Sequence, residues 1–134
     1  MELTIKAKDT NLETVTLFIH KAITDYCTDL IQNQIDLAIE EIFVNIAHYA
    51  YGEQNTENEV KIICTYEYRL LTVSFIDSGT PFNPLEQPDP DITLSAKDRK
   101  IGGLGIFLTK KFMDNVKYAF KNGQNILTFS KQLL

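Results

Sequence analysis

The sequence predicts one α+β domain, a two-layer sandwich in which an antiparallel or mixed sheet carries its helices on one face. Three segments show apolar residues at helical spacing and five show strand-like alternation, in the order strand, helix, helix, strand, strand, helix, strand, strand. The 134 residues suffice for one hydrophobic core but not for two. A hydrophobic content of 44% with 23% charged residues is ordinary for a globular protein.

The first two elements are a strand and a helix. Residues 2–7 alternate between apolar and polar side chains, which predicts a short half-buried strand. Thr10 and Glu13 have the spacing of a capping box, in which the two side chains satisfy free backbone N–H groups. We expect a helix from Thr10 to about Cys27.

A second helix is predicted over Asp36–Gly52, and the other elements are arranged around it. Asn33 is the expected N-terminal cap, and the glycine at the end is the expected left-handed stop. Four isoleucines at helical spacing predict the stripe that faces the core: Ile35, Ile39, Ile42 and Ile46.

Two neighbouring strands follow a polar loop. Alternation over residues 60–68 and 71–77, with a short turn near Arg69, predicts an antiparallel pair. Asp77 falls in phase with the apolar side of the second strand. The pattern therefore aims an acidic side chain at the core.

The last third of the chain contains a long irregular segment, a helix and a hairpin. Residues 78–101 hold all four prolines, and an irregular segment of this length in a compact domain is typical of a functional lid or of a disordered loop. A helix is predicted over Leu104–Met113. Strand-like alternation from residue 116 and again over 126–131 flanks a turn at 121–124, which predicts a closing hairpin.

Composition excludes several classes of function. A net charge of −5 argues against direct nucleic-acid binding, which needs clustered Lys and Arg. No apolar run approaches the roughly 20 residues of a membrane span, and the N-terminus lacks the apolar core of a signal peptide, so we expect a cytoplasmic protein. Cys27 and Cys64 are expected to be buried thiols, and two histidines make a zinc site improbable.

Glu41 and Asn45 lie one turn apart on the second helix, beside the apolar Leu37 and Val44. A carboxylate in such surroundings is poorly solvated unless it has a partner. One interpretation is a general base beside an amide oxygen that ligates a hard cation. The other is a boundary glutamate whose head reaches water.

Asp77 and Gly79 stand where a strand ends. A carboxylate facing an apolar pocket can accept a hydrogen bond from the amine of adenine, and a glycine lets a flat ring approach the backbone. The alternative is an ordinary Asp–Ser–Gly turn after a strand.

A third motif, Gly102–Gly103–Leu104–Gly105, begins the predicted third helix. Glycines at a helix N-terminus leave amides open to phosphate groups. A flexible hinge explains the glycines equally well.

Together these segments resemble the GHKL ATPase superfamily, specifically its anti-sigma factor serine/threonine kinase branch. Glu41–x–x–x–Asn45 resembles the N-box, Asp77–x–Gly79–x–Pro81–Phe82 the first glycine box, and Gly103–Leu104–Gly105 the second. The resemblance extends from about Thr10 to Lys131. It implies the Bergerat-type ATP-binding fold, a two-layer sandwich with ATP between the sheet and the helices, under a lid formed by about residues 83–101.

The resemblance also implies a role for each site residue. Glu41 would be the general base that activates a target hydroxyl, and Asn45 the Mg²⁺ ligand. Asp77 would bind the adenine amine. The full set of residues that would bind ATP is Asn45, Asp77, Gly79, Phe82, Gly103, Leu104 and Gly105.

Two functions remain open. The first is a serine/threonine kinase that phosphorylates a STAS-domain anti-sigma antagonist and sequesters a sigma factor, commonly as a homodimer. The second is a nucleotide-gated switch that binds a partner without phosphotransfer. Tyr49 stands where the branch usually carries His, a departure that we interpret as a change in packing. Gly102 stands where an Arg commonly precedes the glycines, and this missing cation favours the second function. Arg99 or Lys100 could replace the missing cation.

Overall fold

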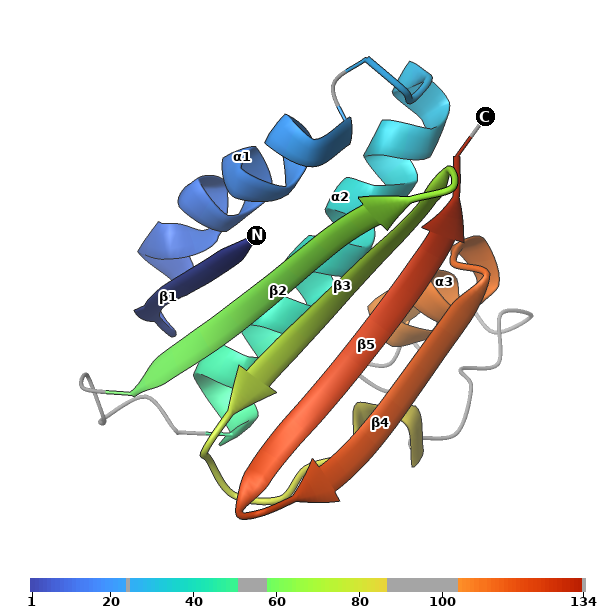
Figure 1. Ribbon diagram of the computed structural model, residues 1–134. Coiled ribbons are helices and arrows are strands. Elements are labelled where there is room, and N and C mark those ends of the chain that lie inside the picture. The colour runs from blue at the N-terminus through green and yellow to red at the C-terminus, as the bar shows by residue number, and fades with distance from the viewer. Residues whose placement is uncertain (24, 51–57, 87–103, 134) are drawn as a thin grey trace.

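The computed structural model describes residues 1–23, 25–50, 58–86 and 104–133. These residues form a five-stranded sheet in the order β1-β2-β3-β5-β4, with the helices packed on one face (Figure 1). Every neighbouring pair of strands is antiparallel, so the sheet is antiparallel throughout and not mixed. The predicted α+β sandwich with helices on one face is confirmed. The strands are β1 (Glu2–Lys6), β2 (Glu59–Glu67), β3 (Leu70–Asp77), β4 (Asn115–Lys121) and β5 (Gln124–Gln132).

Two tight turns fix the register of the sheet. Tyr68 and Arg69, with φ of 52° and 66°, join β2 to β3. Asn122 and Gly123, with φ of 54° and 76°, join β4 to β5. A two-residue loop with both φ values positive has the twist that antiparallel strands require. Both turns lie where the sequence predicts them.

The helices are α1 (Leu12–Ile23), α2 (Asp29–Asn45) and α3 (Leu104–Phe112), with short 3-10 turns at η1 (Asp9–Asn11) and η3 (Pro84–Glu86). A π-helical turn, η2 (Ile46–Ala50), continues α2. Such turns widen a helix locally and are frequent at functional sites. Here the wide turn ends next to the loop that follows β3, where Thr80 donates its N–H to the carbonyl of Ala50 at 2.9 Å.

The start of α2 corrects one prediction. The helix begins at Asp29 and not at Asp36, because Thr28 and not Asn33 is its N-terminal cap. The Thr28 hydroxyl accepts a hydrogen bond from the N–H of Ile31 at 3.3 Å. The acidic Asp29 in the first turn adds a favourable interaction with the helix dipole. The predicted stop at Gly52 lies outside the described residues.

The first helix is shorter than predicted at both ends. It runs from Leu12 to Ile23, because Thr10 belongs to the 3-10 turn η1 and does not cap it. The Asn11 amide fixes that turn by donating to the carbonyl of Lys6 at 2.9 Å. The expected capping box and the extension to Cys27 are therefore wrong.

The core lies between the sheet and α1 and α2. The predicted isoleucine stripe is buried and packs in one cluster with the inward residues of the strands. Burying each such side chain contributes about 1.5–3 kcal/mol. The inward strand residues in the cluster are Val60, Ile62, Cys64, Leu71, Val73, Phe75, Leu127 and Phe129. Cys64 is buried as expected, and Cys27 only partly so. Among the described helices, none is long and apolar enough to cross a membrane.

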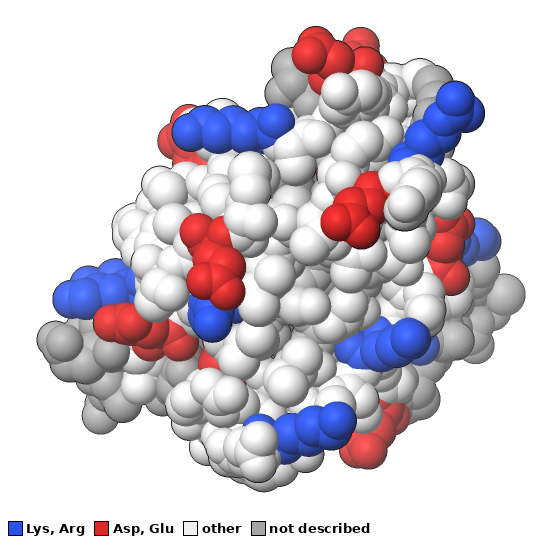
Figure 2. All heavy atoms as spheres, in the orientation of Figure 1, with Lys and Arg blue, Asp and Glu red and all other residues white. Residues whose placement is uncertain are grey.

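The opposite face of the sheet faces outward, as Figure 2 shows in the orientation of Figure 1. Charged side chains lie mainly around its margins, and its centre is uncharged. Ser74 on β3 and Thr128 on β5 share a hydrogen bond of 2.8 Å between their hydroxyl groups on this face.

Candidate functional site

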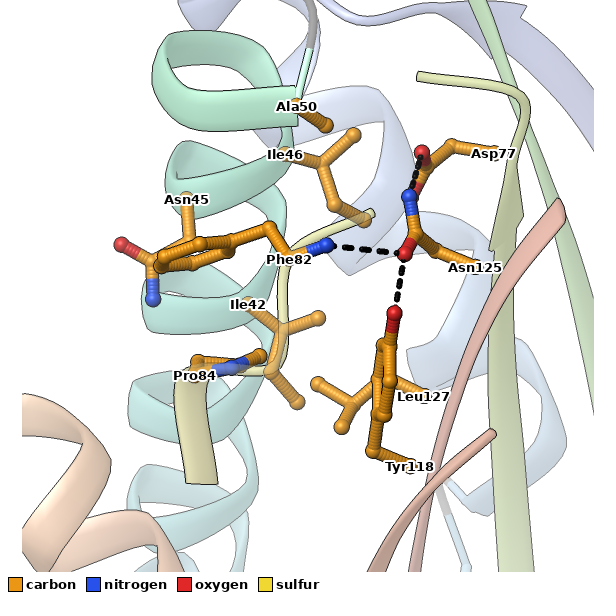
Figure 3. A pocket seen from close by; sticks show the side chains of 10 residues that line it. All are labelled: Ile42, Asn45, Ile46, Ala50, Asp77, Phe82, Pro84, Tyr118, Asn125 and Leu127. Atoms are coloured by element: carbon orange, nitrogen blue, oxygen red, sulfur yellow. Dashed lines mark hydrogen bonds between the residues drawn. The ribbon is translucent and has the colours of Figure 1, made fainter. Parts of the chain in front are cut away.

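A cavity of about 20 Å³ lies between α2 and one end of the sheet. A volume of this size holds roughly one water molecule. Side chains from α2, η2, β3, η3, β4, β5 and the loop after β3 surround it (Figure 3). The lining residues are Ile42, Asn45, Ile46, Ala50, Asp77, Phe82, Pro84, Tyr118, Asn125 and Leu127.

Asp77 is the only acidic residue among these, and it ends β3 with 3% of its surface exposed. Its Oδ1 accepts hydrogen bonds from the N–H of Gly79 and from the side-chain amide of Asn125, both at 2.9 Å. Burial raises the pKa of Asp77, and these two hydrogen bonds oppose that shift. Since both described hydrogen bonds end at Oδ1, Oδ2 can accept from a ligand. The predicted inward aim of this carboxylate is confirmed, and the bond to Gly79 shows that it also forms the local turn.

Asn125, which the sequence analysis did not identify, lies opposite Asp77 on β5 and is 5% exposed. Its Nδ2 also donates to the carbonyl of Thr80 at 3.0 Å. Its Oδ1 accepts from the N–H of Phe82 at 3.1 Å and from the hydroxyl of Tyr118 (Figure 3). The signal for this residue was its position: it falls in phase with the inward-facing residues of β5.

Gly79 lies against the end of the π-helical turn. A Cβ on this residue would lie 2.4 Å from the carbonyl oxygen of Ala50, closer than any real contact allows. The glycine therefore permits the close approach of two backbone segments. Its predicted role beside the adenine ring remains a prediction.

Asn45 and Phe82 both line the cavity and come from two distant segments of the chain. Asn45 is the last residue of α2, and Phe82 lies on the loop after β3 (Figure 3). Tyr49, which is 61% exposed, stacks on Phe82 with 5.5 Å between the ring centroids. An aromatic pair thus stands at this side of the cavity.

Glu41 is not among the residues that line the cavity. It lies half-buried one turn before Asn45, with its carboxylate against Gly105 at the start of α3. A Cβ at residue 105 would be 1.8 Å from Cδ of Glu41 and about as close to both carboxylate oxygens, at 2.1 and 2.2 Å. Burial raises the pKa of Glu41, and the neighbouring charge of Glu40 raises it further.

The structure thus brings three predicted site residues together around one cavity: Asn45, Asp77 and Phe82. Glu41 and Gly105 meet next to it, and Leu104 is exposed at the start of α3. Gly102, Gly103 and most of the predicted lid lie outside the described residues.

The chain matches the family described as histidine kinase-like ATPase domain over residues 5–131. Among curated relatives, the serine-protein kinase RsbW of Listeria monocytogenes serovar 1/2a is 32% identical over 98 residues, covering 69% of this chain and 61% of RsbW. The anti-sigma F factor of Clostridium acetobutylicum is 25% identical over 100 residues, covering 75% of this chain and 68% of that protein. The chain therefore spans about three fifths of the length of the first relative.

Solved structures share the fold. The RsbU and RsbW domains of Rv1364c from Mycobacterium tuberculosis match with a TM-score of 0.66 at 14% identity, covering 99% of this chain and 32% of that one. The catalytic domain of the histidine kinase ThkA matches with a TM-score of 0.54 at 15% identity, covering 98% of this chain and 97% of that one.

The match over nearly the whole chain agrees with the order of the motifs and with the cavity between the helices and the sheet. This chain belongs to the histidine kinase-like ATPase domain family.

Proposed function

We propose that this protein binds Mg-ATP and transfers the γ-phosphate to a serine or threonine of a STAS-type anti-sigma antagonist, and that it sequesters a sigma factor. The observation that carries this proposal is the meeting of Asn45, Asp77 and Phe82 around one cavity, with Glu41 and Gly105 beside it. These five residues come from three motifs that are distant in the sequence.

Asp77 has the environment that a ligand of the adenine amine requires. Its buried carboxylate has Oδ1 held by the protein and Oδ2 available to accept from an exocyclic amine. The surrounding side chains of Ile42, Ile46 and Leu127 are apolar, as the faces of a purine ring require. The cavity of about 20 Å³ is smaller than a purine, so nucleotide binding requires the site to widen.

Asn45 has the chemistry of a Mg²⁺ ligand. Mg²⁺ takes oxygen ligands and usually retains water while it contacts the phosphates of a nucleotide. Among the described residues there is no group of three or more His, Cys, Asp or Glu side chains that would hold a metal without a nucleotide. An amide oxygen from Asn45, together with phosphate oxygens, meets the requirement of the ion.

Glu41 would act as the general base. Its pKa is raised by burial, which increases its affinity for the proton of an attacking hydroxyl. Gly105 opens α3 beside it, where backbone amides and the helix dipole favour negative charge. Phosphoryl transfer needs positioning and charge stabilisation more than covalent chemistry, so this small set of groups suffices.

Phosphate transfer is tested with radiolabelled ATP and a cognate STAS protein. Labelled STAS protein is expected with the wild type, and none with Glu41→Ala. Glu67→Ala is the control, since it removes an exposed carboxylate from β2 and should retain transfer. Absence of phosphate transfer by the wild type would contradict the proposed kinase activity.

The alternative is a nucleotide-gated switch that binds its partner without transfer. The observation in its favour is that Glu41 packs on Gly105 and does not line the cavity. Partner affinity that differs between ATP and ADP, with all phosphate remaining on the nucleotide, would select this function. Equal partner affinity with ATP and with ADP would exclude the nucleotide-gated switch.

A homodimer and a cytoplasmic location complete the proposal. The dimer would form through the outer face of the sheet, because the centre of this face is uncharged and two copies would not repel each other there (Figure 2). Sedimentation should give twice the mass of one chain for the wild type and a smaller mass for Ile76→Lys, on that face. A monomeric wild type would contradict the dimer.

A further inference from the structure

We propose that Asn125 is a positioning residue for nucleotide selection, which orients Asp77 so that the site accepts a 6-amino purine and rejects a 6-oxo purine. The inference rests on the proposed ATP site. Nothing in the sequence motifs draws attention to Asn125, which stands on β5 outside all three of them.

The hydrogen-bonding capacity of Asn125 is fully used by the protein. A side-chain amide has two N–H donors and an oxygen with two lone pairs. Both donors are engaged, by Oδ1 of Asp77 at 2.9 Å and by the carbonyl of Thr80 at 3.0 Å. Both lone pairs are engaged as well, by the N–H of Phe82 at 3.1 Å and by the hydroxyl of Tyr118. Asn125 therefore has no group left for a ligand and acts through Asp77.

The orientation of the amide is determined by groups that can only donate or only accept. The backbone N–H of Phe82 can only donate, so Oδ1 of Asn125 must face it. The carbonyl of Thr80 can only accept, so Nδ2 must face the opposite way. A flipped amide would break both contacts. The side chain of Asn125 consequently always presents a donor to Asp77.

This donor determines what Asp77 presents to a base. The hydrogen bonds that Asn125 and the N–H of Gly79 donate to Oδ1 stabilise the proton-free carboxylate, against the burial that raises its pKa. Oδ2 is then an acceptor. It receives a hydrogen bond from a 6-amino group, and it repels the lone pairs of a 6-oxo group. Selectivity therefore depends on the amide of Asn125.

The test compares the binding of ATP and ITP, which differ at this substituent, by titration calorimetry on the full chain. The decisive variant is Asn125→Asp. It retains an oxygen for Phe82 and Tyr118 but places a second carboxylate against Asp77. The second carboxylate raises the pKa of Asp77, so that Oδ2 of Asp77 carries a proton that it can donate to the oxo group of ITP. The preference for ATP over ITP should fall at least about tenfold, the range expected for one hydrogen bond to a charged group.

Thr128→Val is the matched control. It removes a hydroxyl that bonds across the same two strands, β3 and β5, but on the outer face of the sheet. Its preference for ATP should equal that of the wild type. A residue that serves stability alone would weaken ATP and ITP binding by the same factor, which leaves the ratio unchanged.

A second variant, Asn125→Leu, covers the case in which the aspartate variant does not fold. It removes both donors at similar volume without adding a charge, and it should also lower the preference for ATP. An unchanged ratio in either folded variant overturns the inference. A wild type that binds neither nucleotide would instead refute the ATP site itself.

Discussion

The carboxylate of Glu41 occupies the space that a side chain at residue 105 would need, with only 1.8 Å between Cδ and the position of a Cβ on Gly105. Two motifs that lie 64 residues apart, counted as 105 minus 41, thus meet at one contact between α2 and α3. The glycine is needed there for space as well as for access to backbone amides.

Gly105→Ala should separate folding from catalysis. Alanine is favourable in a helix, and the obstructing atoms are the end of a flexible side chain that can rotate away. We expect the free energy of unfolding to change by less than about 1 kcal/mol, while phosphate transfer is lost because Glu41 is displaced. Thermal melting and the transfer assay measure the two effects. Transfer at the wild-type rate would contradict the assigned position of Glu41.

Gly79→Ala should have the opposite outcome. The obstructing atom is the carbonyl oxygen of Ala50, at 2.4 Å, and a backbone segment cannot rotate away. We expect a loss of about 1–3 kcal/mol, the usual cost of overpacking. Denaturant unfolding of Gly79→Ala beside Gly105→Ala provides the comparison, and equal stability of the two variants would refute this explanation of Gly79.

Glu41→Gln should stabilise the protein in a pH-dependent way. The pKa of Glu41 in the folded state is raised above its ordinary 4.5, so the folded state binds this proton more tightly than the unfolded state does. The wild type therefore loses stability as the pH rises above about 4.5, through the folded pKa, and glutamine avoids that loss. The melting temperature of the variant should exceed that of the wild type at pH 7 and approach it at pH 4.

Glu67→Gln serves as the control for that experiment, since it removes an exposed acid from β2. The difference in melting temperature between Glu41→Gln and the wild type could also be equal at pH 4 and pH 7. That result would mean that the titration of Glu41 does not contribute to stability.

Much of the fold follows from local patterns. Strand alternation predicted β2 and β3 and the inward aim of Asp77, and the Asn122–Gly123 pair marked the last turn. The helix starts were less certain, because several polar residues near Thr28 are plausible caps and tertiary packing decides among them.

The arrangement of the site depended on contacts between distant residues, which local patterns do not contain. The hydrogen bond between Asp77 and Asn125 spans 48 residues and is fixed by the register of β3 against β5. The π-helical turn that brings Ala50 to Gly79 has no marker in the sequence that we recognised. Sequence motifs predicted residues that meet around the cavity, and strand register determines how Asp77 is held there.

Asp77 is proposed to bind adenine at this cavity by accepting a hydrogen bond from its amine. Titration calorimetry of Mg-ATP with the wild type and with Asp77→Asn tests this most directly. Asparagine can still accept from Gly79 and Asn125, so the variant should fold, but it presents an amide where the adenine amine needs an acceptor. We predict saturable binding by the wild type and affinity at least about tenfold weaker in the variant. Equal affinities for Mg-ATP in the two proteins would contradict the claim.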